Sequence, residues 1–265
     1  MASSPRPLPE PQAVRAGGET LRVRRLGAGD RLLLLHGGPG LDHNLLVPLA
    51  LELADAWEVW LPDLPGHGGS GAHPLSLRQT LERLARWCAA CEPRIFGGHS
   101  LGAWLARELL RTRAVHPAAA VLLCPPGAAR GRLARAARPE LGDESEGAQR
   151  ASLIADLEAD GPVDPAVRES VEQTAFRSPS RYGRLQAELL PLLRAAVPPF
   201  DPHCPVLVVA GERDRVSPPG AARAVAAATR SAQLRVLPGA GHVLWSVSPG
   251  ATAEALRDFL AENEL

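Results

Sequence analysis

Residues 94–113 read RIFGGHSLGAWLARELLRTR, and this stretch decides the fold. Its apolar start, residues 94–97, predicts a short strand, and residues 101–113 predict a helix rich in Leu, Ala and Arg. Between them, residues 98–102 (GHSLG) fit the pattern G-x-S-x-G, in which a tight strand-to-helix turn exposes a serine oxygen above a sheet. The competing interpretation is that Ser100 only caps the helix, a position that serine often takes.

The segments on both sides of this turn alternate between strand-like and helix-like patterns. Short solid apolar runs predict strands buried on both faces, and such strands separated by helices predict a mostly parallel sheet with helices on both faces. Residues 19–26 instead alternate apolar and polar side chains, which suits an edge strand. Further strands are predicted at residues 31–35, 57–61, 118–124, 205–210 and 233–237.

This alternation is interrupted once, between residues 127 and 200, where only helical patterns separated by Gly and Pro occur. We therefore expect a core domain made of residues 19–126 and 201–265. Residues 127–200 are expected to be a helical cap, inserted before the strand that bears a candidate acid. Residues 1–18 are rich in Pro and small polar side chains, which predicts a disordered tail.

Candidate partners of Ser100 follow other predicted strands, at the edge where open α/β sheets bind their ligands. A serine at its ordinary pKa is a weak nucleophile and needs a base within hydrogen-bond reach. His242 follows the last predicted strand, and Asp214 follows strand 205–210 and can fix the tautomer of the histidine. Glu212 lies two residues nearer the strand and is interpreted as a turn or surface carboxylate.

A glycine-rich loop, residues 36–40 (HGGPG), follows strand 31–35. Acyl transfer needs N–H groups that face a developing oxyanion, and the backbone N–H groups of Gly38 and Leu101 are the candidates. One such loop is structural by default. Here, however, the glycine-rich loop is followed along the chain by the loops of the serine, the acid and the histidine. Each of these four loops lies at a strand end, and together they predict a nucleophilic site.

The sequence resembles the α/β-hydrolase superfamily from about residue 19 to residue 263. The motifs that carry the resemblance are LLLLHGGPG, LPDLPGHGGSG, GGHSLGAW, LVVAGERDRVSP and LPGAGH. The resemblance implies the α/β-hydrolase fold and a serine hydrolase that forms an acyl-enzyme. It further implies a catalytic triad of Ser100, Asp214 and His242 and an oxyanion hole at Gly38 and Leu101. In the family, a loop like the one at Asp63 is usually structural and close to the pocket.

The branch of the superfamily stays open. HGGPG resembles proline iminopeptidases, but those enzymes usually carry D-Q-R-G-x-G and G-G-S-W-G where this chain has DLPG at 63–66 and GHSLG at 98–102. GHSLG together with DLPGHG looks more like small esterases, such as the pimeloyl-carrier methyl ester esterases, and like a lyase of menaquinone synthesis. Hydrolysis of a small ester, thioester or amide is the first hypothesis. The alternatives are an aminopeptidase, a lyase or perhydrolase, and a receptor-like relative that binds without turnover.

Specificity is expected to come from the cap. The candidate substrate-binding residues are His36, Trp104, Phe176, Tyr182 and Trp245, with core packing as the alternative for the aromatic side chains. An arginine run in the cap is a candidate contact for an acidic substrate or an acyl-carrier protein, with a solvated helix face as the alternative. This run comprises Arg130, Arg132, Arg135 and Arg138.

Composition limits the other classes of function. Basic and acidic residues both number 29, so the chain offers no net charge for nucleic acid or an anionic membrane. There is no run of about 18 apolar residues and no secretory leader, so a cytoplasmic enzyme acting on a small molecule is expected. Cys88 and Cys91 form a C-x-x-C within a predicted helix, which favours reduced, buried thiols over a redox or zinc site. Neither a metal nor a cofactor is expected.

Overall fold

The centre of the protein is one sheet of eight strands, seen in a computed structural model that describes residues 8–71, 73, 75–127, 145–177 and 179–265. The strands are β1 (Gln12–Ala16), β2 (Glu19–Leu26), β3 (Arg31–Leu35), β4 (Glu58–Pro62), β5 (Ile95–His99), β6 (Ala119–Leu123), β7 (Val206–Gly211) and β8 (Ala232–Leu237). Their order in the sheet is β1-β2-β4-β3-β5-β6-β7-β8. The strands from β4 to β8 in this order are parallel, so the predicted mostly parallel sheet is confirmed.

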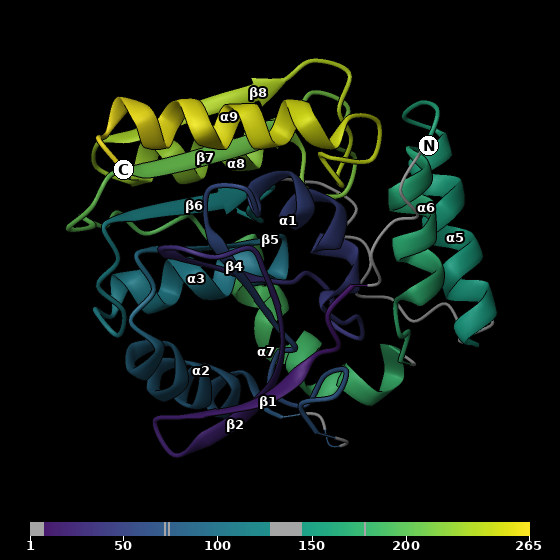
Figure 1. The fold of residues 1–265 in the computed structure, drawn as a ribbon, viewed down its shortest axis with the longest axis horizontal. Coiled ribbons are helices and arrows are strands. Elements are labelled where there is room, and N and C mark those ends of the chain that lie inside the picture. The colour runs from purple at the N-terminus through teal and green to yellow at the C-terminus, as the bar shows by residue number, and fades with distance from the viewer. Residues whose placement is uncertain (1–7, 72, 74, 128–144, 178) are drawn as a thin grey trace.

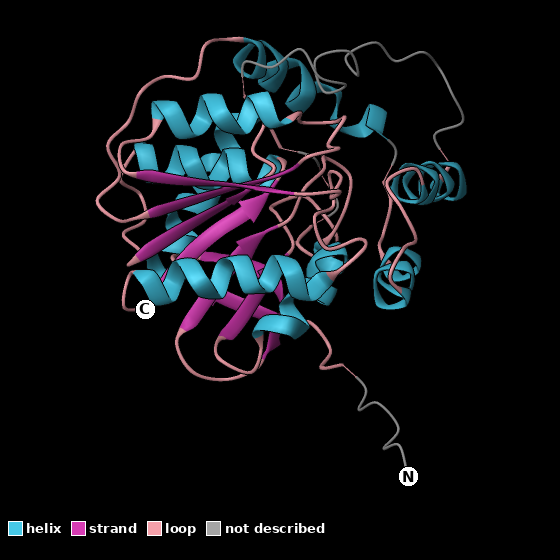
Figure 2. Cartoon of the chain, turned by 90° about the horizontal axis from the view of Figure 1, so that it is seen from above, coloured by secondary structure: helices cyan, strands magenta, loops and turns pink. Residues whose placement is uncertain are grey.

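Helices cover both faces of the sheet (Figure 2). They are α1 (Val47–Leu53), α2 (Leu77–Cys91), α3 (Leu101–Arg111), α5 (Glu146–Glu158), α6 (Pro165–Gln173), α7 (Gly183–Arg194), α8 (Pro219–Ala228) and α9 (Pro249–Glu262), with 3-10 turns η1 (His43–Leu46) and η2 (Pro179–Tyr182). The apolar side chains of α1 and α9 share one core cluster, and those of α2, α3 and α8 share the other. This is the α/β-hydrolase arrangement that the sequence predicts.

The solid apolar strands are explained by burial on both faces. In β3, Leu33 and Leu35 join the cluster of α2 and α3, whereas Leu32 and Leu34 join the cluster of α1 and α9. Because successive side chains of a strand point to opposite faces, both must be apolar when both faces carry helices. The parallel strands also bring their carboxyl ends to one edge, which is the side of α5 and α6 in Figure 1.

The N-terminal segment corrects one expectation. Residues 12–16 were expected in a disordered tail, with 19–26 as the edge strand, but β1 pairs antiparallel with β2 and becomes the edge itself. The indole N–H of Trp87 in α2 donates to the carbonyl of Val14 over 3.1 Å. The strand is only five residues long and lies next to a Pro-rich segment, so its pattern was too weak to stand out.

Between β6 and β7, the described elements are helical: α5, α6, η2 and α7. α6 packs against η1 and α1, whereas α7 packs against α2 on the opposite side of the sheet. Two backbone and side-chain contacts tie the segment to the core: Arg177 N–H donates to the carbonyl of Gly40 over 2.8 Å, and Tyr182 O–H donates to that of Gly66 over 3.1 Å. Within the ranges that the structure describes, no helix is both long and apolar enough to cross a membrane.

Candidate active site

Ser100 lies on the turn between β5 and α3 in a backbone conformation that L-residues seldom adopt, with φ 54° and ψ −117°. Its N–H donates to the carbonyl of Leu123 over 2.9 Å, and its carbonyl accepts from Trp104 N–H over 3.0 Å. The side chain makes no cap hydrogen bond to α3, which goes against the interpretation of Ser100 as a helix cap. Such conformations cost about 1–3 kcal/mol and persist where the surrounding structure imposes them.

Two glycines make this turn possible. A Cβ on Gly98 would lie 2.5 Å from the carbonyl carbon of Gly102 and 2.7 Å from the carbonyl oxygen of Leu35. A Cβ on Gly102 would meet the same carbonyl of Leu35 even more closely. Neither position therefore has room for a side chain, which accounts for the glycines two residues before and two after Ser100.

The structure brings Ser100, His242 and Asp214 into one chain of hydrogen bonds. The Nε2 of His242 lies 3.0 Å from Ser100 Oγ, and its Nδ1 lies 2.8 Å from Asp214 Oδ2. The three residues come from the carboxyl ends of three strands, β5, β7 and β8. A carboxylate only accepts, so Nδ1 of His242 carries the proton in the neutral ring and Nε2 is free to accept the proton of the serine.

The carboxylate of Asp214 is stabilised as an anion. Burial by itself would raise the pKa of Asp214, but the charge and hydrogen bond of His242 and the N–H of Ser217 lower it below its ordinary value. The second oxygen accepts the N–H groups of Val216 and Ser217, both over 2.8 Å. Glu212, by contrast, is exposed and accepts Gly239 N–H over 2.9 Å, which is the turn role expected for it.

The loop at residues 36–40 lies against Ser100. A Cβ on Gly37 would be 3.3 Å from Ser100 Cβ, and Gly38 has φ +135°, a conformation that favours glycine. Neither Gly38 N–H nor Leu101 N–H donates to another group in the described part of the chain. Two free N–H groups on loops that flank Ser100 are what an oxyanion requires.

His36, a candidate substrate contact, has a different place in the structure. Its Nδ1 lies 2.6 Å from the carbonyl of Gly37, and its Nε2 accepts Leu64 N–H over 3.0 Å. Burial, together with the neighbouring His67, lowers the pKa of His36 to about 3. Both nitrogens are used internally in a neutral ring, so His36 joins two loops and offers no nitrogen to a substrate.

The aromatic candidates are also buried within the protein. Trp245 is fully buried and donates from its indole to the carbonyl of Leu45 over 2.8 Å. Tyr182 stacks on His67 with ring centroids 4.5 Å apart. Trp104 and Phe176 belong to the two core clusters. The packing alternative therefore describes the observed contacts of all four.

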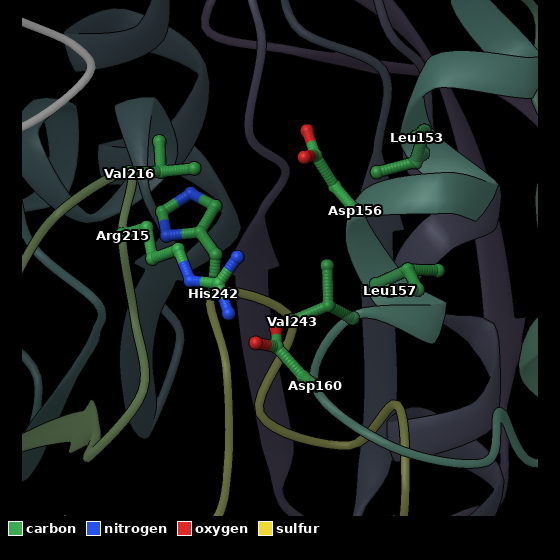
Figure 3. A pocket seen from close by; sticks show the side chains of 8 residues that line it. All are labelled: Leu153, Asp156, Leu157, Asp160, Arg215, Val216, His242 and Val243. Carbon is green, nitrogen blue, oxygen red and sulfur yellow. The ribbon is translucent and has the colours of Figure 1, made fainter.

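A pocket of about 60 Å³ lies beside His242, between α5 and the loop after β7. Figure 3 shows side chains from α5 facing those of the loops that carry His242 and Arg215. Burial raises the pKa of Asp160 in this pocket, and Arg215 opposes the effect. The remaining lining residues are Leu153, Asp156, Leu157, Val216 and Val243. The sequence did not predict this pocket, and its signal there was limited to the helical spacing of Leu153 and Leu157.

Two further groups of polar side chains lie near this site. Asp63 accepts hydrogen bonds from the backbone N–H and from the Nδ1–H of His43, over 3.0 and 2.7 Å, and all of these groups are buried.

Ligand atoms of His99, Cys124 and His242 lie within 4.8 Å of one another, as metal ligands would. However, both ring nitrogens of His242 are hydrogen-bonded, to Asp214 and to Ser100, so this ring has no nitrogen left for a metal while these bonds are formed. All four cysteines are free thiols.

This fold and this site define a class of protein. A profile of the alpha/beta hydrolase family matches residues 32–255. The chain belongs to the α/β hydrolase family, and it is an enzyme of the esterase type within it.

The chain is similar over its length to proteins of one particular name. The pimeloyl-[acyl-carrier protein] methyl ester esterase of Xanthomonas oryzae pv. oryzae (strain MAFF 311018) is 30% identical over 256 residues, which cover 91% of this chain and 99% of that protein. The protein of the same name from Stenotrophomonas maltophilia (strain R551-3) is 29% identical, over 91% of this chain and 96% of its own.

Solved structures show the same fold. A thermophilic esterase from Thermogutta terrifontis, with malate bound, matches with a TM-score of 0.73 at 25% identity, over 96% of this chain and 100% of that one. A serine hydrolase involved in carbazole degradation matches with a TM-score of 0.76 at 19% identity, over 95% and 98% of the two chains.

Proposed function

We propose that this protein hydrolyses carboxylic esters through a covalent acyl intermediate on Ser100. The observation that carries the proposal is the hydrogen-bonded chain from Ser100 Oγ through His242 to Asp214, with the serine on a strained turn. A serine needs this kind of base to become a nucleophile, and the base needs a third group to orient it.

The geometry gives each residue a step. His242 Nε2 takes the proton of Ser100 as Oγ attacks the ester carbonyl, and the N–H groups of Gly38 and Leu101 bind the oxyanion. His242 then gives the proton to the alkoxide as it leaves, while Asp214 stabilises the imidazolium. The pocket beside His242 is large enough for a water molecule, which can attack the acyl-enzyme with His242 again as base.

Labelling with a fluorophosphonate tests the nucleophile. We expect stoichiometric labelling of the parent at neutral pH and none of Ser100→Ala, with labelling mapped by mass spectrometry to the peptide that contains Ser100. The matched control is Ser217→Ala, since the buried hydroxyl of Ser217 donates to the carbonyl of Pro125 over 2.9 Å and has no histidine partner there. Labelling that persists in the folded Ser100→Ala protein would contradict the proposal.

We further propose that the acyl group is presented by an acyl-carrier protein, as a methyl ester. The support is the printed name shared by relatives that this chain matches over about nine-tenths of its length. The arginine run at residues 130–138, expected to meet such a partner, lies outside the described residues.

Three substrates test the carrier proposal and the aminopeptidase alternative: a dicarboxylate monomethyl ester on acyl-carrier protein, the same ester on free pantetheine, and a proline naphthylamide. We expect kcat/KM to be higher by roughly tenfold or more for the carrier-bound ester than for the pantetheine ester, which would correspond to about 1.4 kcal/mol of added transition-state binding. Equal values would argue against a carrier protein. Turnover of the naphthylamide alone would favour the aminopeptidase alternative that HGGPG raised.

A further inference from the structure

The imidazole of His99 lies directly behind that of His242. Its Nε2 is 2.8 Å from the backbone carbonyl oxygen of His242, and the centroids of the two rings are 4.8 Å apart at an interplanar angle of 49°. His99 is buried, at 2% exposure, and precedes Ser100 in the chain. No step proposed so far uses this side chain.

The hydrogen bond fixes the tautomer of His99. A carbonyl oxygen only accepts, so Nε2 of His99 carries the proton and donates, and Nδ1 is left with a lone pair. That Nδ1 is buried and has no hydrogen-bond partner among the described residues. An unpaired buried acceptor is unfavourable, and an aliphatic side chain would avoid it. What the histidine provides here is therefore the donor at Nε2.

The ring of His99 is itself held in place on other sides. It meets the ring of Trp245 edge to face, with centroids 5.0 Å apart, and Trp245 is anchored by its own hydrogen bond to Leu45. On the Nδ1 side lies Gly37, where a Cβ would be 3.1 Å from that nitrogen. One buried ring thus contacts the loop of the base and the loop of the candidate oxyanion hole.

His99 stays neutral beside the base. Burial lowers the pKa of His99 to about 3, with a further contribution from His242; Asp214 acts in the opposite direction and His36 in the same one. A neutral donor orients the carbonyl of His242 without placing a second positive charge next to the imidazolium that forms during catalysis.

We propose that His99 is a positioning residue for the ester hydrolysis described above: its Nε2–H holds the backbone of His242 so that the catalytic imidazole stays within reach of Ser100. The inference rests on the proposed function. A displacement of about 1 Å between reacting groups can lower a rate by roughly 10²-fold, so a single hydrogen bond that fixes the base is worth a measurable part of kcat.

The direct test compares His99→Leu with His99→Gln, each assayed on a methyl ester and checked for its thermal unfolding midpoint. Leucine fills the space without a donor, whereas the amide nitrogen of glutamine can donate from close to the position of Nε2. We expect His99→Leu to lower kcat by roughly 10- to 100-fold with KM within about threefold, and His99→Gln to recover at least half of that loss on a logarithmic scale. Equal losses in both folded variants, or a leucine variant within about twofold of the parent, would overturn the proposal.

A second measurement needs neither turnover nor a folded leucine variant. In the parent protein labelled with ¹⁵N-histidine, NMR correlation spectra distinguish the two imidazole tautomers, and His99 is assigned by the signal that disappears in His99→Gln. We expect the Nε2–H tautomer, without titration between about pH 5 and pH 9. The Nδ1–H tautomer, or titration in that range, would overturn the inference. Because the spectra do not depend on activity, they separate its failure from failure of the proposed function, which the labelling of Ser100 reports.

Discussion

At the scale of single residues, the turn at Ser100 combines a strained backbone with two glycines, which have no side chain. The positive φ of Ser100 is tolerated because Gly98 and Gly102 let β3 and α3 approach the turn closely. Strain of this kind is typical of functional sites, where the surrounding structure over-determines one residue. The glycines are thus part of the machinery that exposes the serine oxygen.

Gly98→Ala tests the space in the turn. The added Cβ would lie 2.5–2.7 Å from backbone atoms of Gly102 and Leu35, which cannot move without disturbing the sheet, so we expect the free energy of unfolding to fall by more than about 2 kcal/mol. Gly147→Ala is the matched control, because nothing lies within 4 Å of its Cβ and the position is in the first turn of α5. It should be neutral or stabilise by up to about 1 kcal/mol. Urea unfolding of both variants measures these changes in the free energy of unfolding. A Gly98→Ala protein as stable as the parent would show that the turn has room for a Cβ at this position.

Two acidic residues near the end of β7 provide a matched pair for the role of the acid. Asp214→Asn removes the charge hydrogen-bonded to His242, and because this change lowers kcat by roughly 10⁴-fold in a serine protease with such a triad, we expect a loss of that order here. Glu212→Gln removes an exposed charge that bonds only to a turn N–H, so kcat should stay within about twofold of the parent. Steady-state kinetics on one ester checks both. A larger loss of kcat in Glu212→Gln than in Asp214→Asn would show that Glu212, and not Asp214, is the acid that acts on His242.

The sequence predicted that Ser100, His242 and Asp214 lie close together because each follows a strand with a clear apolar run, and parallel strands bring such ends together. It did not predict the hydrogen bond between His99 and His242, since a histidine next to Ser100 carries no signal of where its ring points. It placed aromatic residues such as Trp245 at the substrate because size and polarity alone do not separate a pocket wall from a core contact.

At the scale of elements, the segment between β6 and β7 is joined to the core near the loop of residues 36–40. Asp42 is the centre of this junction: its carboxylate accepts the backbone and side-chain N–H groups of Asn44 and the N–H of Ala175, over 2.9 to 3.0 Å. Ser170 of α6 adds a bond of 2.7 Å to the carbonyl of Asn44. α6 is therefore attached to the core by buried polar contacts as well as by apolar packing.

Asp42→Ala tests this attachment. It leaves buried N–H groups unpaired, so we expect the free energy of unfolding to fall by about 3 kcal/mol and the amides of α6 to exchange with solvent faster than those of β5. Hydrogen exchange followed by mass spectrometry measures both regions. The control is Asp201→Ala, which removes an exposed carboxylate paired with Arg230 and should change stability by less than about 0.5 kcal/mol. Unchanged exchange in α6 would show that apolar packing alone attaches it.

The sequence predicted those helices and strands that have a long periodic pattern or a continuous apolar run. The buried strands β3 and β6 and the helix α3 emerge from periodicity alone. β1 did not, because five residues of weak alternation gain their stability from pairing with β2 and from Trp87, neither of which a local pattern contains. The contacts of α6 with η1 and of α7 with α2 are likewise tertiary, so the insertion was predicted as helical without its placement.

At the scale of the whole molecule, three buried histidines make stability depend on pH. Burial lowers the pKa of His36 and His99 to about 3 and of His67 to about 4, from an ordinary value of 6.5. Between these values the unfolded chain binds protons that the folded chain does not, so the free energy of unfolding falls as the pH drops below about 6.5. The lowered pKa of Asp214 adds a loss of the same sign at still lower pH.

Urea unfolding at pH 7, 6, 5 and 4.5 measures this dependence. Each of the three histidines contributes at most about 1.4 kcal/mol per pH unit well below 6.5. His67→Phe keeps an aromatic ring against Tyr182 and should reduce the slope by about a third. The exposed His116→Gln is the control and should leave the slope unchanged. A slope that is the same in His67→Phe and the parent would show that His67 is not a source of the acid sensitivity.

The position of the helical insertion along the chain has a consequence for synthesis. Ser100 precedes the insertion, whereas Asp214 and His242 follow it, at the ends of the last two strands of the sheet. A ribosome therefore synthesises Ser100 some 140 residues before His242. Until β7 and β8 have emerged, Ser100 has neither of its partners in the chain of hydrogen bonds, so the proposed ester hydrolysis should arise only after both strands have been synthesised.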